Sequence, residues 1–154
     1  MVTAHPTPDV QAAMREWQAV TDDLAAIAHA FDTRRLDAPS GCGDWTNRQL
    51  LVHMATGYGV RIAELQAVIE GGAAPPAIDA DAANQRNVDR LSGAPVDEIV
   101  LEMAQVRGGV LVLLSRLQPA HLDASTRLAD GRPLRDALAG LNAHDLEHAA
   151  ELRG

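Results

Sequence analysis

Two histidines near the C-terminal end of the sequence have a spacing that suits metal binding. His144 and His148 are four residues apart in the segment HDLEH (144–148). On an α-helix, residues at this spacing lie on one side, one turn apart, where their imidazoles can converge on a single metal ion. The alternative interpretation is a pair of ordinary, partly exposed histidines near a chain end.

A third histidine, His53, lies level with this pair if the two helices concerned are antiparallel. It is seven residues past Thr46, about 10 Å along a helix, and His148 is about 8 Å from the end of its own helix. Three neutral imidazoles leave a metal with open coordination positions, as in catalytic or substrate-binding centres. We therefore expect a metal site made of His53, His144 and His148. The alternative for His53 is an unrelated, partly buried histidine.

Three acidic residues close to this pair are candidates to accept hydrogen bonds from imidazole N–H groups: Asp145, Glu147 and Glu151. Asp145 is the best of them because it continues the apolar face of its helix. The alternative is that all three are solvated surface charges. Cys42 lies in a glycine-containing loop before the helix of His53. We interpret it as an inert loop cysteine, rather than as a reactive thiol or an extra ligand, and leave it out of the site.

The other histidines, the two tryptophans and three polar residues belong to no recognisable motif. Three histidines on a terminus, a helix flank and a loop receive no role, because surface histidines are common there: His5, His29 and His121. Trp17 and Trp45 are interpreted as core and helix-start packing rather than as ligand platforms. Three residues of a polar segment could border a pocket, although no pattern supports them: Asn84, Arg86 and Asn87.

Four amphipathic segments are expected to position these residues. Apolar residues recur every three or four positions over 8–32, 47–70 and 95–118, which is the period of a helix with one face on a core. The fourth segment opens at Pro133 and continues to the chain end, over 133–154. The clearest start is that of 47–70, where Thr46 and Gln49 form a capping-box pattern.

The connection 71–94 is too long for a tight hairpin, and its polar stretch 79–91 is a candidate short helix. Such a connection can carry the chain along the whole bundle, so that the second and third helices run parallel. The fourth helix then runs against the second, as the three-histidine site requires. We predict an all-α fold: a four-helix bundle with a long crossover between helices 2 and 3, forming one domain over 1–154.

Composition narrows the function classes. The 154 residues include only four aromatic ones, which disfavours an all-β fold, and the 13 basic residues are all arginines without a local patch. The net charge of −8 opposes binding to nucleic acid. The single cysteine cannot form an intrachain disulfide, and no signal-peptide pattern opens the sequence. The longest aliphatic run, 110–114, is too short to span a bilayer. We expect a cytoplasmic protein that binds neither nucleic acid nor membranes.

Two segments resemble one known family. The sequence DWTNRQLLVHM (44–54) is similar to the W-T/S-x-x-x-x-L-x-H-L/M segment of DinB-like proteins, and HDLEHAAEL (144–152) is similar to their closing H-x-x-x-H helix. The resemblance implies a four-helix bundle with a crossover between its second and third helices. It also implies a divalent metal, zinc or nickel first and iron or manganese as alternatives, held by three histidines. His53, His144 and His148 match that pattern.

The same resemblance implies an activity and an assembly. Characterised relatives include mycothiol-dependent maleylpyruvate isomerase and transferases of bacillithiol or related thiols, so we expect a thiol-dependent transferase or isomerase with a low-molecular-weight thiol cosubstrate. The alternative is a non-enzymatic bundle for small-molecule binding or stress, with absent or structural metal. Family members are often dimers, and small or apolar residues on the first and third helices favour a homodimer: Ala12, Ala13, Ala19, Ala25, Ala26, Leu111 and Val112.

Overall fold

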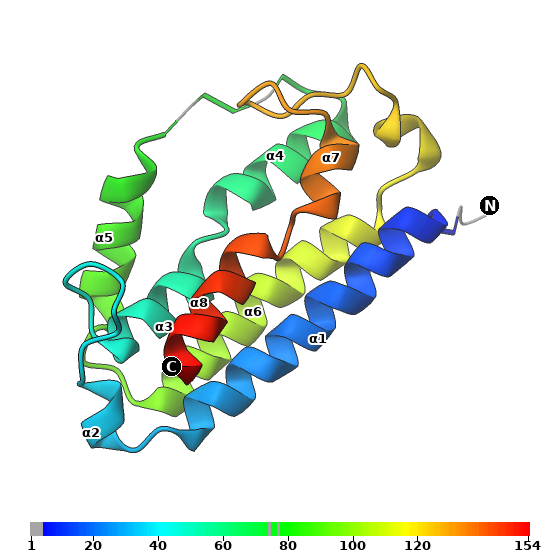
Figure 1. Ribbon diagram of the computed structural model, residues 1–154. Helices are drawn as coiled ribbons and strands as arrows, with labels where there is room; N and C mark the ends of the chain where they lie inside the picture. The colour runs from blue at the N-terminus through cyan, green and yellow to red at the C-terminus, as the bar shows by residue number, and fades with distance from the viewer. Residues whose placement is uncertain (1–4, 74, 77) are drawn as a thin grey trace.

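The structure, a computed structural model, describes residues 5–73, 75–76 and 78–154 (Figure 1). Within these ranges the regular structure is helical, and β-pairing is limited to two isolated bridges, which confirms the all-α prediction. None of the described helices is long and apolar enough to cross a membrane. Residues 1–4, part of the stretch that lacks a signal-peptide pattern, and two residues of the crossover, 74 and 77, lie outside the described residues.

Two long antiparallel helices, α1 (Pro8–Ala30) and α6 (Val96–Ser115), pack side by side along the molecule (Figure 1). The Thr7 hydroxyl caps α1 by accepting a hydrogen bond from the Val10 N–H. Helix α1 ends two residues earlier than expected, because Asp32 caps a separate short helix, α2 (Thr33–Leu36), through the Arg35 N–H. A 3₁₀ turn, η1 (Pro119–Leu122), follows α6 and was also not predicted.

The segment 47–70 forms two helices instead of the one expected, α3 (Asn47–Thr56) and α4 (Gly59–Glu70). The Thr46–Gln49 capping box that begins α3 is present, as predicted. The break comprises Gly57 and Tyr58, and Gly59 begins the next helix. Two glycines so close together weaken the helix at this point, because glycine has a low helix propensity. The break turns the Tyr58 ring toward α1, where it meets the Trp17 ring edge-on at a centroid distance of 4.8 Å.

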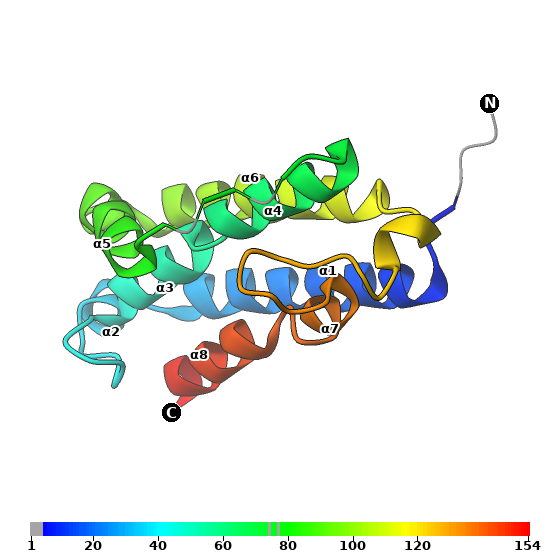
Figure 2. The ribbon, with the colours of Figure 1, turned by 90° about the horizontal axis from the view of Figure 1, so that it is seen from above.

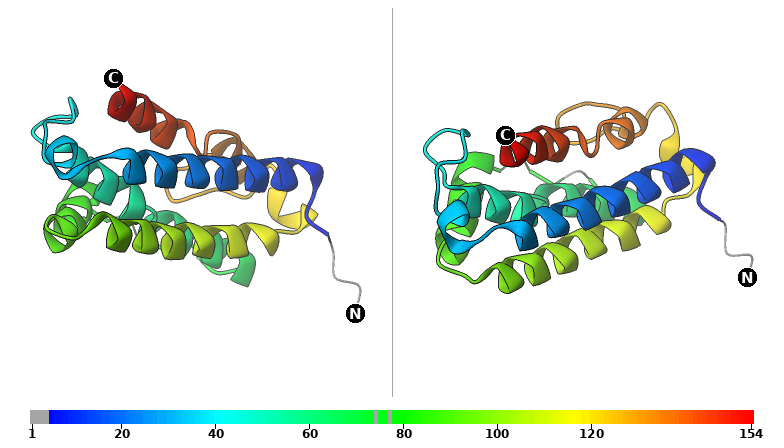
Figure 3. Two further views of the ribbon diagram at one scale, coloured as in Figure 1. Left: turned by 90° about the horizontal axis from the view of Figure 1, so that it is seen from below. Right: turned by 60° about the horizontal axis from the view of Figure 1, so that its bottom comes forward.

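The segment 133–154 is likewise two helices, α7 (Leu134–Ala139) and α8 (Ala143–Arg153), separated by Gly140–Asn142. Pro133 precedes the first helical residue of α7. Helix α8 contacts α1 and α3, and Figure 3 shows α1 lying between α8 and α6 in both views.

The crossover contains α5 (Ala80–Leu91), so the candidate helix over 79–91 is confirmed. It packs on α3, on one side of the molecule (Figure 2). The α3–α4 pair runs in the same direction as α6, and α7–α8 runs against it, which is the predicted topology (Figure 1). The core of the described residues forms two clusters, one around α3 and α8 and the other around α4 and α7. The histidine site lies where α3 and α8 approach each other.

Candidate metal centre

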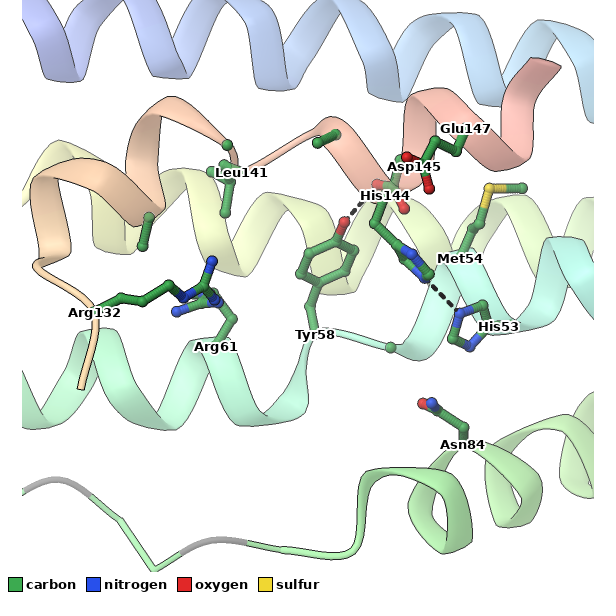
Figure 4. Close-up of a pocket in the computed structure, with 14 residues that line it drawn as sticks. His53, Met54, Tyr58, Arg61, Asn84, Arg132, Leu141, His144, Asp145 and Glu147 are labelled. Atoms are coloured by element: carbon green, nitrogen blue, oxygen red, sulfur yellow. Dashed lines mark hydrogen bonds between the residues drawn. The ribbon is translucent and has the colours of Figure 1, made fainter. Parts of the chain in front are cut away.

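The structure brings together the three histidines singled out from the sequence. His53 on α3 and His144 on α8 place their Nε2 atoms 2.9 Å apart, and the Nε2 atoms of His144 and His148 are 3.1 Å apart. One ligand atom of each residue lies within 4.8 Å of the others. Ligands about 2.1 Å from a shared ion have comparable separations. The close-up in Figure 4 shows the His144 ring facing the His53 ring across the gap between the helices.

The hydrogen-bonding capacity of these rings favours a cation between them. The Nδ1 atom of His148 lies 2.7 Å from Glu151 Oε2, and because a carboxylate only accepts, Nδ1 must carry a proton. In the neutral His148 ring, Nε2 then carries no proton, and its lone pair is directed at His144. A neutral ring nitrogen is either a donor or an acceptor, so His144 Nε2 cannot donate to one neighbour while it accepts from the other. A metal ion would use all three lone pairs, so the donor set fits one.

The environment keeps His53 in its neutral, ligating form. Burial, reinforced by the nearby His144 and His148, lowers the pKa of His53 from its ordinary 6.5 to about 4. The His53 Nδ1 atom is buried without a hydrogen-bond partner among the described residues. His53 and His148 are each 8% exposed, whereas His144 is exposed. The cluster is therefore anchored in the protein on two sides and open on the third.

The acidic residues have different roles from those expected. Glu151 makes the imidazole contact, whereas Asp145, the preferred candidate, does not touch the histidines. Asp145 is fully buried and forms an ion pair with Arg107 of α6. Its Oδ2 atom also accepts a 2.6 Å hydrogen bond from the Tyr58 hydroxyl. Glu147 is exposed beside the site. Asp145 therefore ties α8 to its neighbouring helices instead of orienting an imidazole.

Arg107 is the central residue that sequence reasoning missed. Its Nε atom donates to Thr21 Oγ1 at 2.5 Å, an NH2 nitrogen donates to the Trp17 carbonyl at 3.2 Å, and its guanidinium carbon lies 3.6 Å from the Trp17 ring centroid. The Asn142 amide oxygen, 3.3 Å away, accepts from the same side chain. Arg107 thereby connects α1, α6 and the start of α8. A signal existed, since Arg107 shares the face of Met103 and Val110 on a helix whose stripe is buried.

A cavity of about 470 Å³ opens beside the histidines. His53 and His144 line one end, the Tyr58 ring lies in the middle, and Arg61 and Arg132 line the other end (Figure 4). Burial and the adjacent Asp145 carboxylate raise the pKa of Tyr58, so its hydroxyl remains a donor at neutral pH. Nothing in the sequence pattern pointed to Tyr58, Arg61 or Arg132.

The other candidates lie outside the cavity, with one exception. Asn84 of α5 is among its lining residues, but Arg86 and Asn87 are not. The three histidines that received no role stay away from the cluster: His5 is exposed, His29 pairs with Asp97, and His121 Nδ1 accepts from the Gln118 N–H. Trp17 is core, as expected.

Cys42 is nearer to the site than its loop position suggested. Its sulfur, a ring nitrogen of His148 and a carboxylate oxygen of Glu151 lie within 4.8 Å of one another. Burial and the Glu151 carboxylate raise the Cys42 pKa, so the thiol stays protonated, which agrees with an unreactive cysteine. Trp45 packs against the core around α3, and its ring centroid is 5.0 Å from that of His53. Both residues are partly buried and lie beside the cluster.

The comparison with family models covers nearly the whole chain. The model of the DinB superfamily matches residues 6–152, which include all three histidines and both broken helices. No curated protein and no solved structure matches the chain. Because the match spans the bundle from α1 to α8, the chain belongs to the DinB superfamily.

Proposed function

We propose that this protein binds a divalent metal through His53, His144 and His148 and acts as a thiol-dependent transferase or isomerase. The observation that carries the proposal is the convergence of three imidazole nitrogens at one end of a cavity. Imidazole ligands suit zinc and nickel, with iron or manganese as alternatives. A divalent metal in this position supplies a positive centre that lowers the pKa of a thiol and so favours the nucleophilic thiolate.

The chain's own residues hold and shape the site. Glu151 fixes the orientation of the His148 ring by accepting its Nδ1–H. The exposed His144 borders the cavity, so open coordination positions would face a bound molecule instead of the core. The Tyr58 hydroxyl keeps its proton and donates a hydrogen bond to Asp145, which orients the ring in the middle of the cavity. These contacts favour a rigid site with one open side.

Metal analysis of protein purified without an affinity tag tests the first half of the proposal. After supplementation with zinc or nickel we expect about one ion per chain, lost in His148→Ala and His144→Ala and retained in His29→Ala, an exposed histidine away from the site. Turnover of a low-molecular-weight thiol with an electrophilic alkene, epoxide or halide tests the second half. Substoichiometric metal together with an unchanged His148→Ala variant would overturn the site.

A second candidate is a non-enzymatic bundle that binds a small molecule or acts in stress responses, with an absent or structural metal. It is favoured because the polar residues Asp145 and Tyr58 at the cavity already interact within the protein. Tyr58 donates a hydrogen bond to Asp145, and Asp145 forms an ion pair with Arg107. Thermal melting with and without chelator separates the two. A metal at about 100 times its dissociation constant adds roughly 2.7 kcal/mol. A large chelator effect without turnover of any thiol and electrophile favours the binding protein.

We also propose a homodimer, on a narrower surface than the sequence indicated. Ala13 is buried within the chain and cannot contribute to a partner contact. Ala12, Ala19 and Ala26 remain exposed, seven residues apart along α1. Such a spacing keeps them on one face, where small side chains allow close approach of a second helix.

A further inference from the structure

We propose that Arg61 and Arg132 form a carboxylate-binding subsite at the end of the cavity opposite the histidines. The two residues come from different elements, Arg61 from α4 and Arg132 from the segment before α7, and line the same cavity as His53 and His144. Figure 4 shows both guanidinium groups gathered at that end. The inference deepens the proposed function by naming its substrate class, a small molecule with a carboxylate, and rests on that function only for the metal end.

Each arginine has one acidic partner. Arg61 donates from NH1 to Glu64 Oε2 at 2.7 Å, and Glu64 is itself fixed, because it is 5% exposed and its Oε1 accepts from the Ala129 N–H at 3.1 Å. Arg132 donates from Nε to Asp130 Oδ2 at 2.7 Å. Among the described residues these are the side-chain hydrogen bonds that the two guanidinium groups make. A guanidinium has five N–H donors, so donors remain on both for a ligand.

The charge at this end favours a carboxylate over a phosphate. Glu64 and Asp130 balance the two arginines, so directed N–H donors, more than net charge, would recognise the ligand. The planar fork of a guanidinium matches the two oxygens of a carboxylate, and it also matches two oxygens of a phosphate. A doubly charged phosphate would need a surplus of positive charge, which this pair of ion pairs does not supply. The amide of Asn84 lines the same cavity on the side of His53, away from the two arginines (Figure 4).

The cavity geometry then fixes how such a molecule would lie. With the carboxylate at Arg61 and Arg132, the rest of the ligand extends past the Tyr58 ring toward His144. The Tyr58 ring and Leu141, which also line the cavity, offer apolar walls to the rest of the ligand. The substrate class is therefore a small carboxylic acid whose reacting atom lies away from its carboxylate.

Ligand titration followed by NMR or calorimetry tests the subsite with butyrate, fumarate, neutral butyramide and inorganic phosphate as probes. We expect carboxylates to bind more tightly than phosphate or the amide, and Arg61→Gln and Arg132→Gln to weaken that binding at least about tenfold, the loss expected for hydrogen bonds to a charged group. Arg61→Lys and Arg132→Lys should restore little, because lysine lacks the planar fork. Arg135→Gln, an exposed α7 arginine outside the cavity, is the matched control.

The readouts separate this subsite from the metal centre. Arg132→Gln should keep its metal content and melting temperature, since the Arg132 side chain is 56% exposed. His144→Ala should lose metal yet still bind butyrate. Failure of wild-type protein to bind any carboxylate, unchanged affinity in both arginine variants, or tighter binding of phosphate would overturn the subsite while leaving the metal proposal standing.

Discussion

Replacing Asp145 by asparagine removes one charge from a buried ion pair and leaves Arg107 without its counterion. Both side chains are almost fully buried, with relative exposures of 0% for Arg107 and 1% for Asp145. Breaking such a pair costs about 3–5 kcal/mol. Arg107 keeps its contacts with Thr21 and Trp17, so we expect the lower end, about 3 kcal/mol. For a domain of this size that corresponds to a melting temperature lowered by roughly 6–12 °C.

Urea unfolding followed by circular dichroism, with chelator present so that metal binding does not contribute, measures this loss. Glu147→Gln is the matched control, since it removes a carboxylate from the exposed face of the same helix. The double variant Arg107→Met with Asp145→Leu should recover most of the stability, because two apolar residues leave no unpaired charge. If Asp145→Asn costs no more than Glu147→Gln, the ion pair does not hold α8 in place.

Three further expectations concern the helix break, pH and assembly. Gly57→Ala should destabilise by about 1 kcal/mol, because its Cβ would lie 2.9 Å from the His53 carbonyl oxygen, whereas Gly59→Ala, with nothing nearby, should stabilise α4 by roughly 0.5–1 kcal/mol; equal effects on urea unfolding would contradict this. Because the folded pKa of His53 is lowered from 6.5 to about 4, metal-free protein should lose about 3 kcal/mol as pH falls through that window, and His53→Gln, unlike His29→Gln, should flatten the slope. Light scattering should give twice the 16.4 kDa chain mass, and a monomer at high micromolar concentration would remove the dimer.

The helix starts could be read from the sequence because their causes are local. Thr7 and the Thr46–Gln49 box satisfy N–H groups within three residues, so the residue types nearly determine the geometry. The breaks at Gly57 and Gly140 could not be read with the same certainty. A glycine inside a helical pattern costs only about 1 kcal/mol, so packing elsewhere decides whether the helix continues. Here the contact of Tyr58 with Trp17 and Asp145 accompanies the first break.

The candidate site was predictable where spacing and topology sufficed. His144 and His148 follow from helical periodicity, and His53 follows from the antiparallel run of its helix. The distinction between Asp145 and Glu151 was not predictable, because it depends on Arg107, a residue usually found on the surface.

The arginines of the proposed carboxylate subsite could not be predicted from the sequence, for a different reason. Arg61 and Arg132 are brought together by a loop whose course depends on the whole bundle. No periodicity links them, and each taken alone reads as an ordinary surface charge. The Glu64 and Asp130 contacts, which a sequence does not reveal, show that each guanidinium group has one acidic partner and keeps further donors.

The buried polar network beside the histidines explains why this bundle keeps an ion pair that apolar residues could replace. Successive residues on a helix are rotated by about 100°, so a side chain fixed at Asp145 places His144 and His148 about 100° and 60° away, on the same side. Asp145 is held by Arg107 of α6 and by Tyr58 in the turn between α3 and α4. An apolar core would allow α8 to rotate or slide with little penalty, because hydrophobic contacts are non-directional. The ion pair thus fixes the direction in which both imidazoles point, and the convergence with His53 depends on that direction.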